Sequence, residues 1–423
     1  MKRFLLLLAL LTGFYFRFTA RENAAVPEKV DLPVYGFIDY SMNKIQIPGD
    51  SSRIRSFYQK VGRLLNDGEG QINILHIGGS HIQADIFSHQ VRRNLEAINS
   101  RFQTPRGFIF PFSVAKTNNP ANYKVTYTGK WANVKNVQYN REISVGVGGI
   151  AVYTNDPEAS IRVTLNTEEY SGRWRFDRLR LLGYTEEESE TGTVEPVLYN
   201  GDLPLKASFD FISNSYLFEL PESADSFRVA FIQKDTVPHT FILTGFIPEK
   251  ETPGIVYHAI GVNGASVPSY LSSEFFEDEL PLIMPDLVVF EIGVNDASGS
   301  GFKVNSFIQN YNLLIERIKH VLPDCAFIFI TNNDTFKRIK KRTYRVNSNG
   351  LIAKEAFFKI AEENQGGVWD LFSIMGGMKS MQTWQANGLA QADKIHFTRT
   401  GYELLGDLFY NALIDLYLQI NIE

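Results

Sequence analysis

The chain changes its pattern twice, and this change constrains the fold more than any other feature of the sequence. Before residue 116, a helical pattern at 54–65 precedes an apolar run at 72–77, a Gly78-Gly79-Ser80 turn and a helical pattern at 81–98. An apolar strand, a tight glycine turn and a helix are typical of an α/β sheet. Similar patterns return after residue 250, with predicted strands at 254–259, 287–290 and 326–330 and predicted helices at 305–321, 348–364 and 400–420.

The stretch between these two pieces has no helical pattern of useful length. Short runs rich in Val, Thr, Tyr, Phe and Ile alternate with turn residues, which is typical of an all-β sandwich or jelly roll. The predicted strands lie at 123–128, 143–147, 161–165, 174–182, 216–220 and 227–232. We therefore predict one α/β domain in two parts, 51–115 and 251–423, with an all-β sandwich inserted at 116–250. Residues 21–50 are predicted to be a linker or a surface arm.

The start of the chain predicts export. Lys2 and Arg3 precede an apolar stretch of about 13 residues, which is shorter than the roughly 20 that a membrane-spanning helix needs. We predict that residues 1–20 are a signal peptide or, alternatively, an uncleaved N-terminal anchor. No later run is long and apolar enough to span a bilayer. The sequence thus predicts a periplasmic or extracellular protein with no integral membrane domain apart from that anchor.

Charge and cysteine content exclude several classes of function. Lys and Arg number 42 against 47 Asp and Glu, so the net charge is −5 and the chain has no overall basic surface for nucleic acid. Cys325 is the only cysteine, which excludes an intramolecular disulfide and a multi-cysteine zinc site. These two observations favour a globular protein whose chemistry depends on other side chains.

One serine and one histidine have the surroundings that nucleophilic catalysis requires. A serine becomes a nucleophile when a histidine accepts its proton and a third group orients that histidine. Ser80 is predicted between a strand end and a helix, where its hydroxyl would be accessible and its N–H could help to stabilise an oxyanion. Among the seven histidines, only His396 follows an acidic residue by three positions, and that residue is Asp393. An Asp-x-x-His turn lets the carboxylate accept the Nδ1–H of the imidazole.

Two further segments supply candidate groups for an oxyanion hole. The strand at 287–290 leads into Gly293-Val294-Asn295-Asp296, which places the Asn295 side-chain amide at a second strand end. The segment 261–266 is a glycine turn after the strand at 254–259. Within it, Gly264 would leave room for a substrate beside an exposed backbone N–H.

In their order along the chain, these segments resemble the four sequence blocks of the SGNH/GDSL hydrolases. Within that superfamily, the segments 80–85, 261–265, 369–372 and 375–378 are similar to the peptidoglycan O-acetylesterase group. The resemblance extends over about residues 70–420 and implies a three-layer, flavodoxin-like α/β domain. It also implies that the β-rich block is a sandwich resembling a carbohydrate-binding module.

The resemblance implies a role for each candidate residue. Ser80 would be the nucleophile, and His396 would be the general base and then the general acid, oriented by Asp393. The oxyanion hole would consist of the backbone N–H groups of Ser80 and Gly264 and the side chain of Asn295. The resemblance implies no metal or organic cofactor.

Three neighbouring residues are candidates for lining the pocket, namely Gly79, His81 and Asn263. The family usually has Asp immediately before the serine, where this chain has Gly79. An Asp there can brace the turn and cap the helix, so Gly79 predicts a looser turn.

The predicted helix 81–98 also has an alternative interpretation as part of a metal site. His81, Asp85 and His89 recur at four-residue spacing and could share one helical face. No fourth ligand is apparent and no histidine pair surrounds a Glu, so packing or pocket lining is favoured and no metal is predicted.

Each catalytic motif also has a purely structural interpretation. Ser80 could cap a helix, Asp393 and His396 could form a surface turn, and Asn295 could lie in an ordinary turn after a strand. The joint order of the motifs favours catalysis, because independent coincidences multiply.

Three functions remain open from the sequence. The favoured one is an exported serine esterase that removes O-acetyl groups from an acetylated polysaccharide, with a cell-wall glycan as the first substrate to test. The second is a polysaccharide O-acetyltransferase, and the third is a non-catalytic glycan-binding protein on a degenerate hydrolase scaffold. Trp131, Trp174 and Trp384 are candidate side chains for stacking on sugars. The sequence predicts neither the natural glycan nor the oligomeric state.

Overall fold

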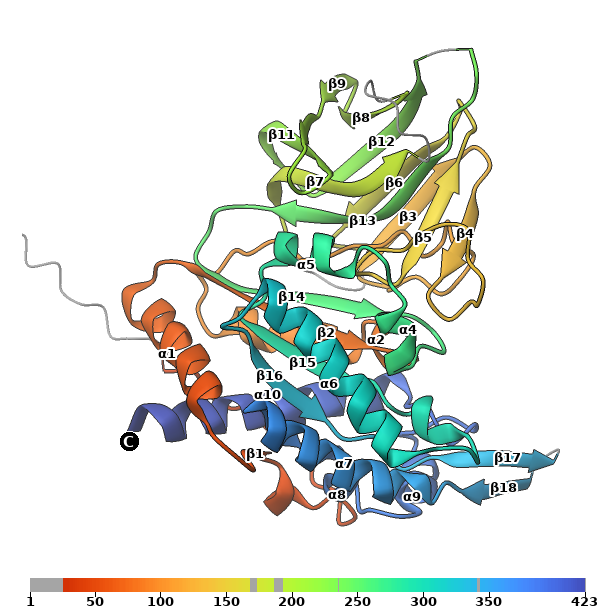
Figure 1. The fold of residues 1–423 in the computed structure, drawn as a ribbon. Helices are drawn as coiled ribbons and strands as arrows, with labels where there is room; N and C mark the ends of the chain where they lie inside the picture. The colour runs from red at the N-terminus through yellow and green to blue at the C-terminus, as the bar shows by residue number, and fades with distance from the viewer. Residues whose placement is uncertain (1–25, 168–172, 186–192, 235, 341–342, 423) are drawn as a thin grey trace, which may run out of the picture.

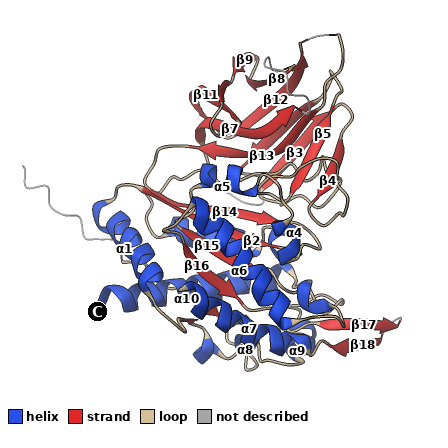
Figure 2. Ribbon diagram, in the orientation of Figure 1, coloured by secondary structure: helices blue, strands red, loops and turns tan. Residues whose placement is uncertain are grey.

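The computed structural model describes residues 26–422 except 168–172, 186–192, 235 and 341–342. The predicted signal peptide or anchor at 1–20 lies outside the described residues. Figure 2 shows helices gathered around one sheet in the lower part of the molecule and strands filling the upper part. The α/β pattern and the β-rich pattern of the sequence therefore correspond to two structural regions.

A six-stranded sheet forms the centre of the lower region, in the order β1-β19-β16-β15-β2-β14. Its neighbours are parallel except for β1, which pairs antiparallel with β19. The strands are β1 (Ile45–Gln46), β2 (Gln71–Gly78), β14 (Gly254–Gly261), β15 (Leu287–Glu291), β16 (Ala326–Ile330) and β19 (Gly367–Trp369). Numbered along the chain, the five parallel strands follow the order 2-1-3-4-5, which is typical of the flavodoxin-like fold that the resemblance implied. Part of the predicted arm at 21–50 supplies the edge strand β1.

Helices cover both faces of this sheet and complete three layers (Figure 1). Along β2, Ile74 belongs to the core shared with α1, α3 and α10, whereas Leu75 and Ile77 belong to the core shared with α5, α6 and α7. None of the helices in the described residues is long and apolar enough to cross a membrane. The helices are α1 (Ser52–Asp67), α3 (Phe87–Ala97), α4 (Val267–Leu271), α5 (Phe276–Ile283), α6 (Val304–Val321), α7 (Asn349–Asn364) and α10 (Arg399–Ile422).

Short elements decorate the ends of this sheet. They are the helices α2 (Ser80–Gln83), α8 (Leu371–Ile374) and α9 (Ser380–Ala386), the 3₁₀ turns Tyr40–Met42 and Asp296–Ser298, and the hairpin of β17 (Phe336–Lys340) and β18 (Thr343–Val346).

The upper region is an all-β sandwich, as predicted. One sheet has the order β10-β11-β7-β13-β5-β4 and the other has the order β3-β6-β12-β8-β9. The strands are β3 (Tyr123–Thr128), β4 (Ala132–Lys135), β5 (Ile150–Thr154), β6 (Ser160–Leu165), β7 (Phe176–Thr185), β8 (Val194–Asn200), β9 (Leu203–Lys206), β10 (Ser208–Asp210), β11 (Ser215–Ala224), β12 (Ser226–Gln233) and β13 (Phe241–Glu249).

One predicted strand of the sandwich is wrong. Residues 143–147 form no strand and make a single β-bridge between Gly146 and Phe275. Carboxylates take the place of a partner strand, because Glu274 accepts the N–H of Val145 and Glu279 accepts the N–H of Val147. The apolar run is buried at the junction with α5, so its composition resembled that of a strand.

The predicted helix at 81–98 is also wrong as a single helix. It breaks between α2 and α3, where Asp85 has a φ of 48°. The Asp85 carboxylate is buried between Arg92 and Arg106 and accepts a hydrogen bond from Asn122 at 2.6 Å. These contacts hold the kinked backbone, so His81, Asp85 and His89 do not lie on one continuous helix. In the part of the chain that the structure describes, no group of three or more His, Cys, Asp or Glu side chains is arranged to hold a metal ion.

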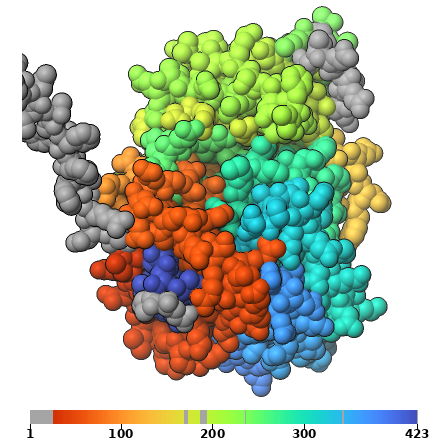
Figure 3. All heavy atoms as spheres, turned by 60° about the vertical axis from the view of Figure 1, so that its left-hand side comes forward, coloured from red at the N-terminus to blue at the C-terminus, as the bar shows by residue number. Residues whose placement is uncertain are grey.

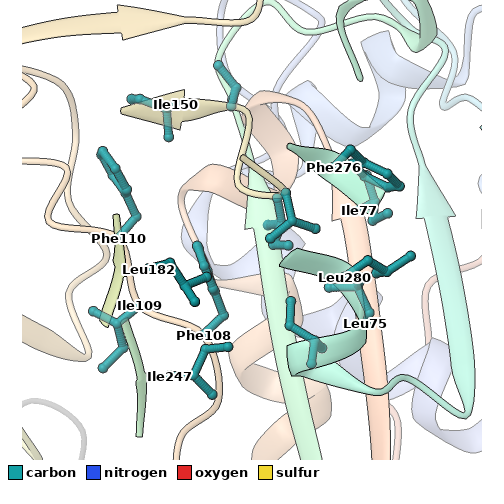
Figure 4. Close-up of a cluster of buried hydrophobic side chains, with 14 of the residues drawn as sticks. Leu75, Ile77, Phe108, Ile109, Phe110, Ile150, Leu182, Ile247, Phe276 and Leu280 are labelled. Carbon is teal, nitrogen blue, oxygen red and sulfur yellow. The ribbon is translucent and has the colours of Figure 1, made fainter. Parts of the chain in front are cut away.

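The sandwich and the α/β domain share one apolar core. Figure 4 shows side chains of β2, α5, the sandwich and the segment before β3 meeting at the junction, among them Leu75, Phe108, Leu182 and Leu280. All four are less than 4% exposed. In Figure 3 the sandwich lies directly on the α/β domain. The inserted block is therefore packed against the α/β domain through a shared apolar core.

Candidate active site

Ser80 lies where the sequence predicted it, at the carboxyl end of β2, between the strands β15 and β14. The chain leaves β2 at Gly78, turns at Gly79 and enters α2 at Ser80. A side chain on Gly78 would collide with Ile82, since its Cβ would lie 2.4 Å from Cγ1. The turn is held by the Tyr270 hydroxyl, which donates to the Gly78 carbonyl at 2.8 Å. This geometry leaves the Ser80 hydroxyl at the edge of the sheet where a substrate can approach.

Ser80, His396 and Asp393 form a continuous hydrogen-bonded chain. The Oγ of Ser80 is 2.7 Å from Nε2 of His396, although the two residues are 316 positions apart. Nδ1 of His396 is 2.7 Å from Oδ2 of Asp393. Because Nδ1–H donates to the carboxylate, Nε2 is left to accept the serine proton. The other carboxylate oxygen accepts the N–H groups of Ile395 and His396, which fixes the Asp-x-x-His turn.

The candidate oxyanion groups line the same cavity as Ser80 and His396, and its volume is about 510 Å³. Gly264 adopts a φ of 86°, a conformation that favours glycine. The Asn295 side-chain amide donates to the Ala265 carbonyl at 2.8 Å, so it ties the loop after β15 to the Gly264 loop and retains a second N–H. The structure thus brings together every sequence-predicted site residue, with Gly79, His81 and Asn263 also in the lining.

The sequence model of the GDSL-like lipase/acylhydrolase family matches residues 247–404. The chain carries a GDSL-like lipase/acylhydrolase domain. This domain supports the esterase of the SGNH type that the motifs predicted. The matched range contains Gly264, Asn295, Asp393 and His396, whereas Ser80 precedes it on the far side of the inserted sandwich.

Several solved structures are similar to this chain. The esterase resembles a peptidoglycan O-acetylesterase with a TM-score of 0.69 and 19% identity, covering 89% of this chain and 99% of that chain. A catalytic mutant of an acetylxylan esterase from Geobacillus stearothermophilus matches with a TM-score of 0.31 and 18% identity, covering 38% of this chain and 73% of that chain. A lipase/acylhydrolase from Enterococcus faecalis matches with a TM-score of 0.28 and 26% identity, covering 38% of this chain and 77% of that chain. No curated protein matches the chain.

The electrostatics of the esterase site keep Asp393 ionised. Partial burial would raise the pKa of Asp393, but hydrogen bonds from the His396 ring and from the Ile395 and His396 N–H groups outweigh burial and lower the pKa to about 2. Asp393 is therefore a carboxylate at neutral pH. A negative charge beside Nδ1 stabilises the imidazolium that forms when His396 takes up a proton.

His81 packs against the catalytic histidine as a neutral ring. Its centroid lies 5.2 Å from that of His396, and its Nδ1 is 2.8 Å from the Tyr402 hydroxyl. Burial, together with the nearby His396, lowers the pKa of His81 to about 3. A neutral neighbour does not compete with His396 for a positive charge, so His81 fits a role in shaping the pocket.

A buried acid at the floor of the cavity is also neutral. Glu291 ends β15, and its Oε2 lies 3.5 Å from Nε2 of His76. Burial raises the pKa of Glu291 well above its usual range and lowers the pKa of His76 to about 3. The floor therefore carries no carboxylate charge that would repel an oxyanion above it.

Sequence reasoning missed an amide network that holds the Gly264 loop. The Gln83 side chain accepts the N–H of Asn263 at 2.8 Å and donates to Oδ1 of Asn118 at 2.8 Å. The Asn263 side chain donates to the same oxygen at 2.7 Å. Gln83 follows the nucleophile turn, and Asn118 lies where the chain enters the sandwich, so no local motif could have linked them.

Gly79 leaves the turn open on one side. Its φ of −103° is accessible to any residue, and an added Cβ would lie 3.5 Å from both the Ala265 carbonyl oxygen and Nδ2 of Asn295. The turn is braced without a side chain at this position, because the Gly79 carbonyl accepts the N–H groups of Ile82 and Gln83. An Asp could therefore be accommodated here, and its absence removes no member of the hydrogen-bonded chain.

Proposed function

We propose that this protein is an exported serine esterase that removes O-acetyl groups from a polysaccharide, with a cell-wall glycan as the favoured substrate. The observation that carries the proposal is the unbroken Ser80–His396–Asp393 hydrogen-bonded chain beside Gly264 and Asn295. The name of the peptidoglycan O-acetylesterase, whose fold extends over 89% of this chain, supports the choice of substrate class. The export signal predicted at residues 1–20 supports the choice of compartment.

The first half of the proposed reaction forms an acetyl-serine. His396 Nε2 takes the proton of the Ser80 hydroxyl while Oγ attacks the acetyl carbonyl carbon. The carbonyl oxygen becomes an oxyanion and receives hydrogen bonds from the Ser80 and Gly264 N–H groups and from the Asn295 amide. The tetrahedral intermediate collapses, the bond to the sugar oxygen breaks, and the His396 imidazolium gives its proton to that oxygen.

The second half regenerates the enzyme with water. His396 takes a proton from a water molecule, which attacks the acetyl-serine carbonyl, and the proton then returns to Oγ of Ser80 as acetate leaves. The His396 and Asp393 side chains are 29% and 43% exposed, so solvent reaches the base directly. This access favours hydrolysis over transfer of the acetyl group to a second sugar.

The test is hydrolysis of p-nitrophenyl acetate by the purified protein beside its Ser80→Ala variant. We expect the substitution to lower kcat by at least about a thousandfold while the circular dichroism spectrum stays the same. A matched control is Ser208→Ala, which removes an exposed serine on β10 of the sandwich. If Ser80→Ala were as active as the wild type, Ser80 would not be the nucleophile and the proposed mechanism would be refuted.

Product analysis separates the esterase from the alternative O-acetyltransferase. An acetylated oligosaccharide is incubated with the enzyme and an unacetylated acceptor sugar. The esterase releases free acetate in an amount equal to the ester lost. Appearance of acetylated acceptor in place of acetate would instead assign a transferase.

A further inference from the structure

A second cavity adjoins the catalytic one on the other side of the Gly264 loop. Its volume is about 350 Å³, within the usual size range of ligand sites. The loop at 136–141, which follows β4, forms one wall, and α4 with the residues after it forms the other. Gly264 and Ala265 line the catalytic cavity while Ser266 lines the second one. We call this second cavity the side cavity.

The side cavity lies within reach of a chain molecule bound at Ser80. A Cβ on Gly264 would lie 4.0 Å from Cγ1 of Val137, which belongs to the wall of the side cavity. The two cavities are thus separated by only the width of the loop that carries a candidate oxyanion N–H. A polymer that presents one unit to Ser80 can place a neighbouring unit here.

The walls of the side cavity carry no net charge. Arg141 and Glu274 are the charged residues in its lining, and they pair with each other at 2.6 Å. Nη1 of Arg141 also donates a hydrogen bond to the Ser272 hydroxyl at 3.2 Å, so residues of the cavity wall hold the guanidinium in place. A compensated lining disfavours an anionic or cationic ligand, because neither would find an opposite charge to pair with.

The remaining lining has the chemistry that recognises sugars. Gln138 and Asn140 offer amides, and the partly exposed Ser266 offers a hydroxyl, which suit the hydroxyl groups of a neutral carbohydrate. Tyr139 and Pro268 offer apolar faces for the C–H groups of a sugar ring. Amides and hydroxyls beside an aromatic ring favour a neutral sugar over an aliphatic chain.

Tyr139 is more exposed than the tryptophans that the sequence suggested as stacking side chains. Its side chain is 96% exposed, so a ligand can cover the ring without displacing any protein contact. By contrast, Trp174 and Trp384 are 1% and 0% exposed, which corrects their assignment as stacking side chains. Trp131 packs edge-on against Phe231 and donates its indole N–H to the Thr128 carbonyl.

We propose that the side cavity is a subsite for an uncharged sugar unit next to the one that carries the ester, with Tyr139 as its stacking side chain. This inference rests on the proposed function and deepens it, because it makes the enzyme select a polymer rather than a single acetylated sugar. The inserted sandwich thereby supplies a specificity-determining residue to the α/β domain.

The test compares two substrates in the full protein, O-acetylated chito-oligosaccharide and p-nitrophenyl acetate. The measured quantity is the ratio of kcat/KM for the oligosaccharide to kcat/KM for the small ester. Tyr139→Ala should lower this ratio about fivefold through KM, the effect of losing one aromatic stacking partner. Tyr139→Phe keeps the ring and should retain the ratio of the wild type.

A matched control is Phe211→Ala, which removes another exposed aromatic side chain of the sandwich, at the turn between β10 and β11. Its ratio should equal that of the wild type. An unchanged ratio in Tyr139→Ala, or an equal fall in Phe211→Ala, would overturn the subsite. A wild-type enzyme that hydrolyses the small ester and releases no acetate from the oligosaccharide would overturn the proposed substrate and the subsite together.

Discussion

The catalytic cavity and the junction between the domains differ in solvent access, although both lie beside the central sheet. The junction is mainly apolar, with Leu75, Phe108 and Leu280 less than 4% exposed (Figure 4). The cavity is open to solvent, and hydrogen bonds hold the Ser80, His396 and Asn295 side chains in its lining. Burial of apolar area is the main source of folding free energy, whereas correctly positioned hydrogen bonds in the active site determine the catalytic rate. Substitutions in the two regions should therefore separate stability from activity.

The largest effect among these predictions is expected at Asn295. Asn295→Ala removes a proposed oxyanion donor and its bond to the Ala265 carbonyl, so kcat for p-nitrophenyl acetate should fall about a hundredfold to a thousandfold. The free energy of unfolding should change little, since the side chain is only partly buried. Asn312→Ala, which removes an amide bonded to Glu363 on α7, is the control. A fall in stability without a fall in kcat would reverse the assignment of this residue.

The next largest effect is expected at the junction. Leu280→Ala deletes a fully buried side chain and should lower the free energy of unfolding by about 3 kcal/mol, as measured by urea denaturation. The kcat of the remaining folded enzyme should stay close to that of the wild type. Leu351→Ala, at a position 46% exposed on α7, should cost far less. If the folded fraction of Leu280→Ala had a much lower kcat than the wild type, the junction would also position the active site.

A polar group inside the junction should make stability depend on pH. Burial raises the pKa of Glu279 from 4.5 to about 7, and hydrogen bonds from Thr244 and the Val147 N–H only partly oppose this rise. Between pH 4.5 and 7 the folded chain thus binds more protons than the unfolded chain. The free energy of unfolding should then fall as pH rises through this window, by about 3 kcal/mol.

Glu279→Gln should remove this part of the pH dependence, because an amide does not titrate. Urea denaturation at the two ends of the window measures the difference. Glu362→Gln, an exposed position on α7, is the control and should keep the slope of the wild type. A slope that survives in Glu279→Gln would assign the pH dependence to another buried group.

The smallest effect is expected where the sandwich meets the cavity. Gln83→Leu removes the acceptor for the Asn263 N–H and the donor to Asn118, so the Gly264 loop should be placed less well and kcat should fall about tenfold. Asn118→Ala leaves the bond between Gln83 and Asn263 in place and should cost less. If Asn118→Ala lowered kcat more than Gln83→Leu, the entry segment of the sandwich would act on the substrate directly.

Local patterns predicted most of the α/β elements, because each depends on neighbours in the sequence. The strand at 72–77 and the helices at 305–321, 348–364 and 400–420 lie within one or two residues of β2, α6, α7 and α10. The wrong predictions fall where distant groups satisfy the backbone. Glu274 and Glu279 replace a strand partner for 143–147, and Arg106 helps to hold Asp85 in the break between α2 and α3.

The sequence by itself determined which residues have catalytic chemistry and in what order they occur. Ser80 at a strand–helix turn and Asp393 three positions before His396 are local features that need no knowledge of the fold. Only the tertiary structure decided that Ser80 and His396 lie 2.7 Å apart, that Gln83 and Asn118 brace the Gly264 loop, and that Tyr139 rather than a buried tryptophan is open to a sugar. The physical reason is that exposure and contact between distant segments depend on how the sandwich packs on the sheet, and no short pattern encodes that packing.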